Sequence, residues 1–229
     1  MIEYIVPENI DDRILARAAK LLGEGGTAAL PTDTSWSIVC SMNSREGIKR
    51  LRSISKERDE RLFTLLCSDI SQFGELCSLD NSRFRLIKRL APGPYVFILK
   101  TLPGTEKVLG LRRREIGVRL PDYPVPQALI NALGCPLYGI TAKRTMAVAA
   151  LADEDAGWID EDSDEEDDGT SAFYREETLF DGGWEMEDIR GLDLILDPGE
   201  DRSRLFSTVL DLSSGDVQVL RQGAGAWPA

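Results

Sequence analysis

A short polar segment between two apolar runs contains the residue types in this sequence that are best suited to chemistry. Thr32, Asp33 and Thr34 follow the apolar run 28–30, and the chain becomes apolar again at 38–40. Buried hydroxyls and carboxylates cost free energy unless they are hydrogen-bonded or paired. Two interpretations remain open: a tight turn held by its own side-chain hydrogen bonds, or the floor of a binding site for a polar ligand.

The absence of histidine restricts the chemistry. None of the 229 residues is histidine, which excludes Ser-His-Asp and Cys-His nucleophilic sites, histidine-based proton transfer and the HExxH class of metal site. Any chemistry must therefore use lysine, arginine, hydroxyls, carboxylates, backbone amides or a metal held by oxygen ligands. We assign no catalytic residue and no metal ligand from these patterns.

Cations at two places could meet an anionic ligand. Lys56 and Arg58 lie in a predicted loop and could both reach one polyanion, although a solvated basic surface is an equally ordinary interpretation. In the predicted strand 115–121, the alternation of side chains places Arg119 on the face opposite Val118. A buried arginine is costly unless an anion meets it, so we expect either a structural salt bridge or a ligand carboxylate beside Arg119.

Length and composition indicate one globular domain over 1–229. The apolar fraction of 42% is enough for a sizeable core, and no apolar run approaches the length needed to span a bilayer. No N-terminal signal sequence is evident. The cysteines are far apart and form no C-x-x-C pair, which favours free thiols in a reducing cytoplasm over disulfides or a zinc site; they are Cys40, Cys67, Cys77 and Cys135.

The net charge of −12 comes almost entirely from one segment. Residues 153–168 hold eleven acidic residues and no basic one, so the rest of the chain is nearly neutral. We expect 150–190 to be an acidic insertion within the domain, solvated around 153–168, with the aromatic and apolar residues after it able to pack against the body. An alternative is that the acidic run lowers nonspecific nucleic-acid binding by screening basic surfaces.

Apolar periodicity predicts alternating helices and strands. Helical spacing predicts helices near 14–22, 48–54, 81–90 and 125–133, and a shorter one before Cys77. Apolar or alternating runs predict strands at 1–7, on both sides of the Thr-Asp-Thr segment, and at 62–67, 95–99, 115–121, 136–140, 192–196, 206–212 and 217–221, of which the last two form a hairpin.

In chain order, five motifs resemble those of the YrdC-like family, and most closely its YciO branch. The motifs are P-T-D-T at 31–34, K-x-R at 56–58, P-G-P at 92–94, G-V-R-x-P at 117–121 and T-A-K at 141–143. The segments 206–212 and 219–223 are similar to the closing pair of strands in that family. Each motif alone is weak, but the ordered set is specific, and the resemblance covers about 1–144 and 190–225.

The resemblance implies an α/β (α+β) fold: a single domain with a twisted mixed β-sheet and flanking helices around a concave basic pocket, of the YrdC/RibB-like type. It also implies a threonylcarbamoyl-AMP synthase-like activity, in which ATP, L-threonine and bicarbonate give threonylcarbamoyl-AMP and pyrophosphate for the t6A modification of tRNA. Mg²⁺ would accompany ATP. Such a reaction needs positioned cations and no histidine.

The resemblance also implies site residues. Thr34, Arg119 and Thr141 would bind the amino-acid substrate, with Arg119 holding its carboxylate. The nucleotide would be bound by Lys56, Arg58, Lys143, Ser207 and Arg221.

Four departures from the family pattern predict an altered ligand or a lost synthase activity. Trp36 and Ser37 replace Tyr and Gly, Arg61-Leu62-Phe63 replaces K-P-L, Val96 replaces a threonine, and Thr141-Ala142-Lys143 replaces S-A-N. The alternative function is a non-catalytic double-stranded RNA or tRNA-binding module of the same fold. The basic stretches 49–61, 83–89 and 107–119 favour that alternative, which predicts binding that weakens steeply with salt.

Overall fold

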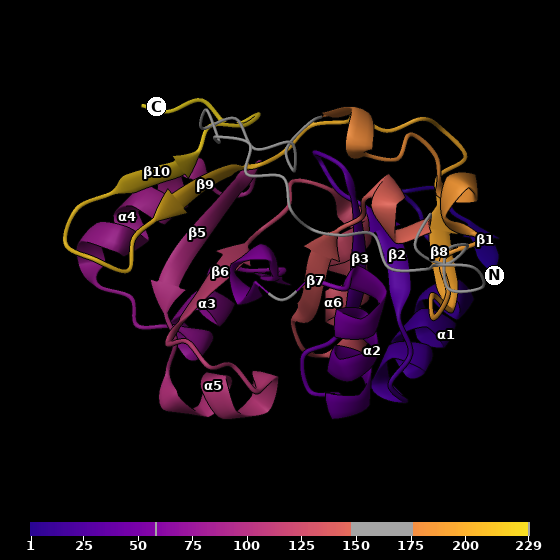
Figure 1. Cartoon of the computed structure of the whole chain (residues 1–229), viewed down its shortest axis with the longest axis horizontal. Coiled ribbons are helices and arrows are strands. Elements are labelled where there is room, and N and C mark those ends of the chain that lie inside the picture. Colours follow the sequence, from indigo (N-terminus) through magenta and orange to yellow (C-terminus); the bar gives the residue numbers. More distant parts are fainter. Residues whose placement is uncertain (58, 148–175, 229) are drawn as a thin grey trace, which may run out of the picture.

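Ten strands form one mixed β-sheet that runs through the whole molecule (Figure 1). The computed structural model describes residues 1–57, 59–147 and 176–228. The strand order is β1-β8-β2-β3-β7-β4-β6-β5-β9-β10. The strands are β1 (Ile2–Tyr4), β2 (Ala28–Pro31), β3 (Trp36–Ser41), β4 (Thr64–Leu66), β5 (Tyr95–Lys100), β6 (Glu115–Arg119), β7 (Leu137–Thr141), β8 (Leu194–Asp197), β9 (Thr208–Asp211) and β10 (Gln218–Arg221).

Helices begin where the sequence provides caps. The helices are α1 (Asp12–Gly23), α2 (Arg45–Ser55), α3 (Ser71–Leu76), α4 (Asn81–Leu90), α5 (Pro103–Leu109) and α6 (Pro124–Leu133), with short 3₁₀ turns at η1 (Glu60–Leu62), η3 (Glu176–Thr178) and η4 (Gly183–Met186). Asp11, Ser44 and Asp80 accept backbone N–H groups at the starts of α1, α2 and α4. The sequence analysis missed α5, although Pro103 at its start and Gly110 after its end are ordinary helix boundary signals.

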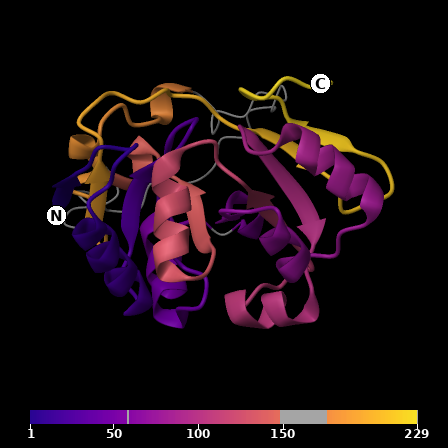
Figure 2. The same cartoon turned by 180° about the vertical axis from the view of Figure 1, so that it is seen from behind.

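Two apolar clusters lie on opposite faces of the sheet. On one face α1 and α6 lie side by side and bury Leu22, Leu129 and Ile130 against β2, β3 and β8 (Figure 2). On the other face α2, α3, α4 and α5 bury side chains such as Leu51, Phe73 and Ile87 against the inward residues of β5, β6 and β7. The mixed α/β single domain implied by the sequence is confirmed.

The face of the sheet that carries α1 and α6 is apolar beneath these helices and more polar toward the central strands. In β6, Val118 points into the core on the side of α2 to α5, whereas Gly117 and Arg119 face the other way. In β7, Leu137 packs below α6, but Gly139 and Thr141 on the same face line a cavity. The alternation of side chains therefore directs polar residues of the central strands to a part of the sheet that none of the described helices covers.

The described end of the predicted acidic insertion packs on the body. Leu179, Phe180 and Met186 are buried, as expected from their apolar character, but Trp184 is 66% exposed. The run 153–168 lies outside the described residues. The predicted hairpin at the C-terminal end is confirmed, because β9 and β10 pair in antiparallel fashion. The cysteines are free, and Cys40, Cys67 and Cys77 are buried.

Candidate functional site

The Thr-Asp-Thr segment forms a tight turn between β2 and β3. The Thr32 hydroxyl donates to the carbonyl of Ser35 at 2.6 Å and accepts the backbone N–H groups of Thr34 and Ser35 at 3.2 Å. The Thr32 N–H also donates to the Ser35 carbonyl. The turn interpretation is therefore correct, and Thr32 holds the turn rather than the Asp33 carboxylate. The Thr34 hydroxyl also lies 3.2 Å from the Thr32 hydroxyl. Because Thr32 fixes the backbone, the side chains of Asp33 and Thr34 are held where both can contact a neighbouring residue.

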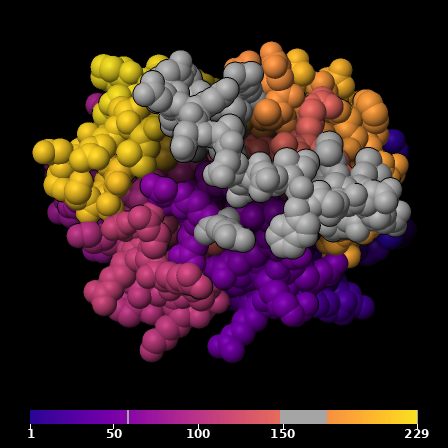
Figure 3. All heavy atoms as spheres, viewed as in Figure 1, coloured from indigo at the N-terminus to yellow at the C-terminus, as the bar shows by residue number. Residues whose placement is uncertain are grey.

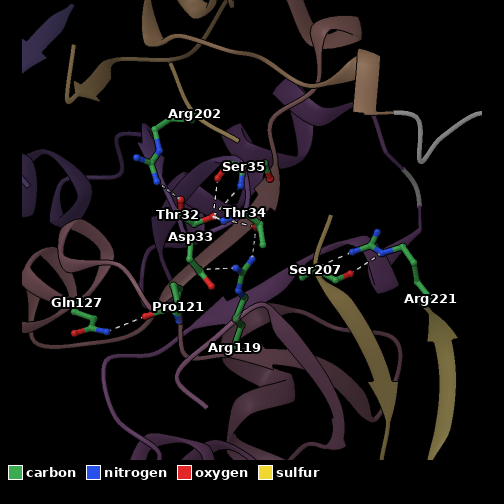
Figure 4. A network of polar contacts seen from close by, with 10 residues as sticks. All are labelled: Thr32, Asp33, Thr34, Ser35, Arg119, Pro121, Gln127, Arg202, Ser207 and Arg221. Carbon is green, nitrogen blue, oxygen red and sulfur yellow. Dashed lines mark hydrogen bonds and ion pairs between the residues drawn. The ribbon is translucent and has the colours of Figure 1, made fainter. Parts of the chain in front are cut away.

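That neighbour is Arg119, at the end of β6 (Figure 4). Its Nη2 donates to Asp33 Oδ1 at 2.6 Å and its Nη1 donates to Thr34 Oγ1 at 3.0 Å. Arg119 is only 5% exposed. Burial lowers the pKa of Arg119, and the charge and hydrogen bond of the Asp33 carboxylate oppose this shift. Of the two partners expected for Arg119, the structure shows the structural salt bridge.

In this ion pair, each of the two residues keeps one polar atom that makes no hydrogen bond with the described residues. Arg119 Nε and Asp33 Oδ2 are buried and have no hydrogen-bond partner among the described residues. Unsatisfied buried polar atoms are rare in folded proteins, because each costs about 1–3 kcal/mol. A ligand that offers both an acceptor and a donor at this point would satisfy them.

Arg119 lines a cavity of about 360 Å³ on the face of the sheet that carries α1 and α6, beside the part that these helices cover. This volume lies within the usual range of small-molecule sites, roughly 300–1,000 Å³. Its polar lining comes from strands, from the segment after α2 and from the C-terminal hairpin, and consists of Ser37, Asp59, Arg61, Thr64, Arg119, Thr141, Lys143, Ser207 and Arg221. Four cations and one carboxylate therefore line the cavity itself.

Each cation at the cavity is held by a protein partner. Lys143 Nζ lies 3.3 Å from Glu57 Oε1, and Arg61 pairs with Asp59. The hydrogen bond from the Arg61 side chain lowers the pKa of Asp59. Arg221 donates through Nε to the Ser207 carbonyl at 2.9 Å and through Nη2 to Ser207 Oγ at 3.2 Å (Figure 4). These contacts fix the positions of the charges before any ligand enters.

The structure brings together most of the residues that the sequence analysis named. Five of them line the one cavity: Arg119, Thr141, Lys143, Ser207 and Arg221. Thr34 is not part of the lining but touches Arg119 directly. Lys56, in a left-handed conformation after α2, lines a separate recess. Arg58 lies outside the described residues. The binding roles of all eight stay predictions.

Sequence analysis missed three charged residues of the site. Asp33, the partner of Arg119, lay inside the Thr-Asp-Thr segment but was not assigned a role. Asp59 and Arg61 lie in the basic loop beside Lys56 and line the cavity as a pair. An anion beside Arg119 was expected, because a buried arginine on a strand requires one, but no local pattern identified Asp33 as that anion.

Residues 202–205, which follow β8, contact the turn between β2 and β3 on the side opposite Arg119. Arg202 Nη2 donates to the Thr32 carbonyl at 3.1 Å, and its guanidinium lies 4.4 Å from the centre of the Tyr123 ring. The Leu205 N–H donates to the Thr34 carbonyl at 3.2 Å. In Figure 4 Arg202 lies on the far side of the turn from Arg119. Residues 202–205 therefore fix the backbone that carries Asp33 and Thr34.

The departures from the family pattern differ in their relation to the cavity. Ser37, Leu62, Val96 and Lys143 line it directly. Trp36 is fully buried and donates through Nε1 to the Asp181 carbonyl at 3.1 Å, so it contributes to the core rather than to the cavity. Arg61 and Thr141, which also differ from the family pattern, line the cavity as well, so the differences that a ligand there would meet are those at 37, 61, 62, 96, 141 and 143.

No group of three or more potential metal ligands comes together among the residues that the structure describes. Across 1–57, 59–147 and 176–228, no helix combines the length and apolar character needed to cross a bilayer.

Comparisons with known proteins identify relatives of this chain. The Sua5_yciO_yrdC family model, described as "Telomere recombination", matches residues 20–157. The "Uncharacterized protein YciO" of Escherichia coli K12 is 36% identical over 135 residues, which are 58% of this chain and 66% of that protein. The alignment thus spans slightly less than two thirds of that relative. A threonylcarbamoyl-AMP synthase of Xanthomonas axonopodis pv. citri is 28% identical over 131 residues, which are 56% of this chain and 70% of the synthase.

Solved structures agree with these relationships. The crystal structure of E. coli YciO superimposes with a TM-score of 0.76 at 27% identity, and the match covers 100% of this chain and 98% of the other. P. abyssi Sua5 complexed with L-threonine superimposes with a TM-score of 0.74 at 21% identity, over 97% of this chain and 57% of the other. The second similarity shows a shared fold.

Proposed function

This chain belongs to the Sua5/YciO/YrdC family, and from that premise we propose that its cavity binds an adenine nucleotide together with a small amino acid, in the manner of a threonylcarbamoyl-AMP synthase. The observation that carries the proposal is the meeting of Arg119, Thr141, Lys143, Ser207 and Arg221 around one cavity of about 360 Å³. Several threonylcarbamoyl-AMP synthases are related in sequence, and a related fold has been solved with L-threonine.

The amino-acid end of the cavity would lie beside Arg119. Its guanidinium is aligned by Asp33 and Thr34 and can share its remaining N–H with a ligand carboxylate. The unused Asp33 oxygen can accept from a ligand N–H. An α-amino acid has both groups, which is why L-threonine is the proposed substrate.

The phosphate end would lie among Arg61, Lys143 and Arg221. Positioned cations stabilise phosphate oxygens and the negative charge of a departing pyrophosphate. The hydroxyls of Thr141 and Ser207 add donors to the same wall. Mg²⁺ would enter bound to the ATP phosphates, because no cluster of carboxylates in the described chain is placed to hold it.

In the proposed reaction bicarbonate takes up a proton and loses water to give CO₂, and the amine nitrogen of threonine bonds to the carbon of CO₂ and releases a proton. An oxygen of the resulting carbamate then bonds to the α-phosphorus of ATP as the bond from that phosphorus to the pyrophosphate oxygen breaks and pyrophosphate leaves. The chain's contribution is to hold the two anionic substrates in line and to neutralise phosphate charge. No side chain is required as a nucleophile, which agrees with the absence of histidine.

The test is pyrophosphate release that requires both L-threonine and bicarbonate. Thr141→Val and Ser207→Ala each remove one cavity hydroxyl with little change in volume and should lower the rate about tenfold or more, since a hydrogen bond to a charged group contributes roughly 1.5–3 kcal/mol. Arg85→Ala, on the exposed face of α4, is the matched control and should leave the rate unchanged. Release of pyrophosphate without threonine dependence would contradict the proposal.

A second candidate function, binding of double-stranded RNA or tRNA, is favoured by a groove between α2 and α5. Arg45, Lys49 and Lys107 line it and have no ion-pair partner in the described chain, and Arg52 completes a set of four cations. The groove lies at the lower edge of Figure 3, between the magenta α5 and the violet α2. Phosphate contacts of this kind release counterions, so the affinity should fall steeply with salt.

The RNA candidate is tested by fluorescence anisotropy with a labelled RNA duplex between 50 and 200 mM salt, a range over which binding through four phosphates loses about 10²-fold in affinity. The double variant Lys49→Ala, Lys107→Ala should weaken binding and flatten the salt dependence. The double variant Lys88→Ala, Arg89→Ala on α4 is the control of equal charge. Equal effects of the two variants would exclude the groove as the contact surface.

A further inference from the structure

A second cavity lies at the β1 end of the sheet, far from the site described above. It measures about 420 Å³ and is formed between β1, the start of η4 and the loop after β8. In Figure 1 β1 and β8 lie at one end of the molecule, whereas β6, which carries Arg119, lies in its middle. The two cavities share no lining residue.

Two exposed aromatic rings line this cavity. Tyr4 of β1 is 69% exposed and Trp184 of η4 is 66% exposed. Bare backbone lies against Trp184, because a Cβ built on Gly182 would lie 2.5 Å from its Nε1. The glycine therefore allows the indole to sit close to the chain at this position.

A buried carboxylate, that of Asp197, also lines the cavity. Asp197 pairs with Tyr4 in the parallel register of β1 and β8, and it is only 3% exposed. Its Oδ1 accepts the N–H of Gly199 at 2.8 Å. Its Oδ2 has no hydrogen-bond or ion-pair partner in the described part of the chain and packs where a Cβ on Gly183 would lie 2.4 Å away.

A carboxylate that has little access to water and no positive partner is costly in free energy. The remaining charges of this cavity have the same sign, because Glu200 and Asp201 also line it and no cationic residue does. Arg202, which follows these residues in the chain, already pairs with Glu200 at 3.0 Å and donates to the Thr32 carbonyl. The described residues therefore place negative charge in this cavity without a matching positive charge.

The geometry excludes a simple metal site and favours a larger cation. Among the described residues, these carboxylates do not come close enough together to form a metal-binding group. The faces of aromatic rings attract ammonium and guanidinium groups, with tryptophan the strongest of the three aromatic side chains. Two accessible rings beside a buried carboxylate suit a cation that has both charge and carbon surface.

We propose that this cavity binds an organic cation, namely an alkylammonium or guanidinium group. The cation donates to Asp197 Oδ2 while its apolar part lies against the rings of Tyr4 and Trp184, and the exposed carboxylates of Glu200 and Asp201 add attraction at the mouth. The inference rests on the residues of this cavity and does not depend on the function proposed for the first one.

The experiment compares two probes that have nearly the same shape but differ in charge. L-arginine amide carries a guanidinium, and L-citrulline amide carries a neutral ureido group in its place. Titration calorimetry, together with the part of the tryptophan fluorescence change that Trp184→Phe removes, should show that arginine amide binds. Citrulline amide should bind at least about tenfold more weakly, because the ion pair and the cation–π contact are lost. Equal binding of both probes would overturn the proposal.

Variants locate the binding at this cavity. Asp197→Asn keeps the oxygen that accepts from Gly199 and removes only the charge, so it should fold and should weaken arginine amide about tenfold. Trp184→Ala should weaken it severalfold. Glu187→Gln, an exposed charge change just after η4, is the matched control and should have no effect. Unchanged affinity in Asp197→Asn would overturn the proposal.

Two further arms identify the source of the cation. Spermidine represents free polyamines, and the peptide Gly-Arg-Gly represents an arginine side chain of a protein. The probe with the lower Kd shows which of these two cations the cavity prefers. Mg²⁺ and Ca²⁺ are titrated in parallel. Binding of either metal that is abolished by Asp197→Asn, with no binding of any organic probe, would replace the proposal by a metal site. Asp197→Asn should leave ATP and L-threonine binding unchanged, so that the two cavities are tested separately.

Discussion

Arg119 and Asp33 form a buried ion pair that joins two segments distant in the sequence. Arg119 ends β6 and Asp33 lies in the turn between β2 and β3, and their side chains meet at 2.6 Å. The pair is almost completely shielded from water, since the two side chains are 6% and 13% exposed. The protein therefore supplies its own carboxylate to the arginine that the proposed ligand would use.

The first prediction is that Asp33→Asn destabilises the fold. Removing one partner of a buried pair leaves the other charge uncompensated, which typically costs about 3–5 kcal/mol in the free energy of unfolding. The measurement is urea-induced unfolding followed by circular dichroism. Sodium sulfate should restore part of the stability of the variant, because an anion that binds beside Arg119 only in the folded state stabilises it.

The control for the first prediction is an exposed pair. Arg17 lies 2.7 Å from Glu3, with the arginine side chain 63% exposed, and Arg17→Ala should cost less than about 1 kcal/mol. If Asp33→Asn were as mild as Arg17→Ala, the Asp33–Arg119 pair would not be the electrostatic centre of the site.

The second prediction concerns Arg202 as a positioning residue. Its guanidinium donates to the Thr32 carbonyl and covers the Tyr123 ring, but it does not line the first cavity. Arg202→Ala should lower the free energy of unfolding by about 1–2 kcal/mol. It should also weaken L-threonine severalfold, because the turn that carries Asp33 and Thr34 loses its support.

The Arg202 prediction is checked by calorimetry and has two comparisons. Arg202→Lys keeps the charge but cannot donate to the carbonyl and cover the ring in the same way, so it should recover little of the affinity. Arg204→Ala removes a partly exposed pair with Asp181 on the same segment and should leave the affinity unchanged. Loss of stability without loss of affinity in Arg202→Ala would mean that Arg202 is structural only.

The sequence predicted the parts of the site that depend on local patterns. Strand alternation placed Arg119 opposite Val118, and the structure agrees. The ordered motifs also pointed to Thr141 and Ser207, which lie far apart in sequence and share one cavity. Family resemblance was needed for this step, since neither residue has a local signal of its own.

The sequence could not predict features that depend on tertiary pairing. The Asp33–Arg119 contact joins residues 86 positions apart, and propensity says nothing about such a pairing. Lys56 was grouped with the cavity cations, but a left-handed residue ends α2 there and Lys56 lines another recess. The cavity near Asp197 also escaped notice, because its rings and carboxylates come from three separate segments.

The third prediction concerns the close packing of β5 and β6 below the first cavity. A Cβ on Gly117 would lie 2.8 Å from Val96 Cγ1 and 3.2 Å from Thr64 Oγ1. Gly117→Ala should therefore destabilise the protein by about 1–3 kcal/mol through overpacking. Adding Val96→Ala removes the nearest methyl group and should recover about half of the loss, in the range expected for relieved overpacking.

Thermal unfolding checks the third prediction against a glycine in open space. Nothing lies within 4 Å of a Cβ built on Gly74 in α3, so Gly74→Ala should stabilise the protein by about 0.5–1 kcal/mol. If Gly117→Ala stabilised the protein as Gly74→Ala does, β5 and β6 would be able to move apart without a loss in the free energy of unfolding. The packing at Gly117 would then not be a constraint on the cavity wall.

The fourth prediction is a pH dependence centred on Asp193. Its carboxylate accepts Arg50 Nη2 at 2.7 Å and the Thr27 N–H at 2.9 Å, and so joins α2 to the segments that lead into β2 and β8. Partial burial acts to raise the pKa of Asp193, but the hydrogen bonds from Arg50 and Thr27 outweigh it, so the pKa is lower than normal.

The sign of the effect follows from that lowered pKa. An aspartate in the unfolded chain has a pKa of about 3.9, and the folded value lies below it. The contribution of Asp193 to stability is therefore fully present above about pH 5 and is lost as the pH falls through 3.9 toward the folded pKa. Asp193→Asn should cost about 1–2 kcal/mol at pH 7 and progressively less as the solution becomes more acidic.

The measurement is urea unfolding of the wild type and Asp193→Asn at pH 7, 5 and 3.5. Arg50→Ala removes the other half of the same contact, so its cost should shrink over the same interval. A difference between wild type and Asp193→Asn that does not vary with pH would show that Asp193 acts through packing rather than charge. The junction between α2, β2 and β8 would then be held by the Thr27 hydroxyl, which donates to the Gly191 carbonyl at 2.6 Å.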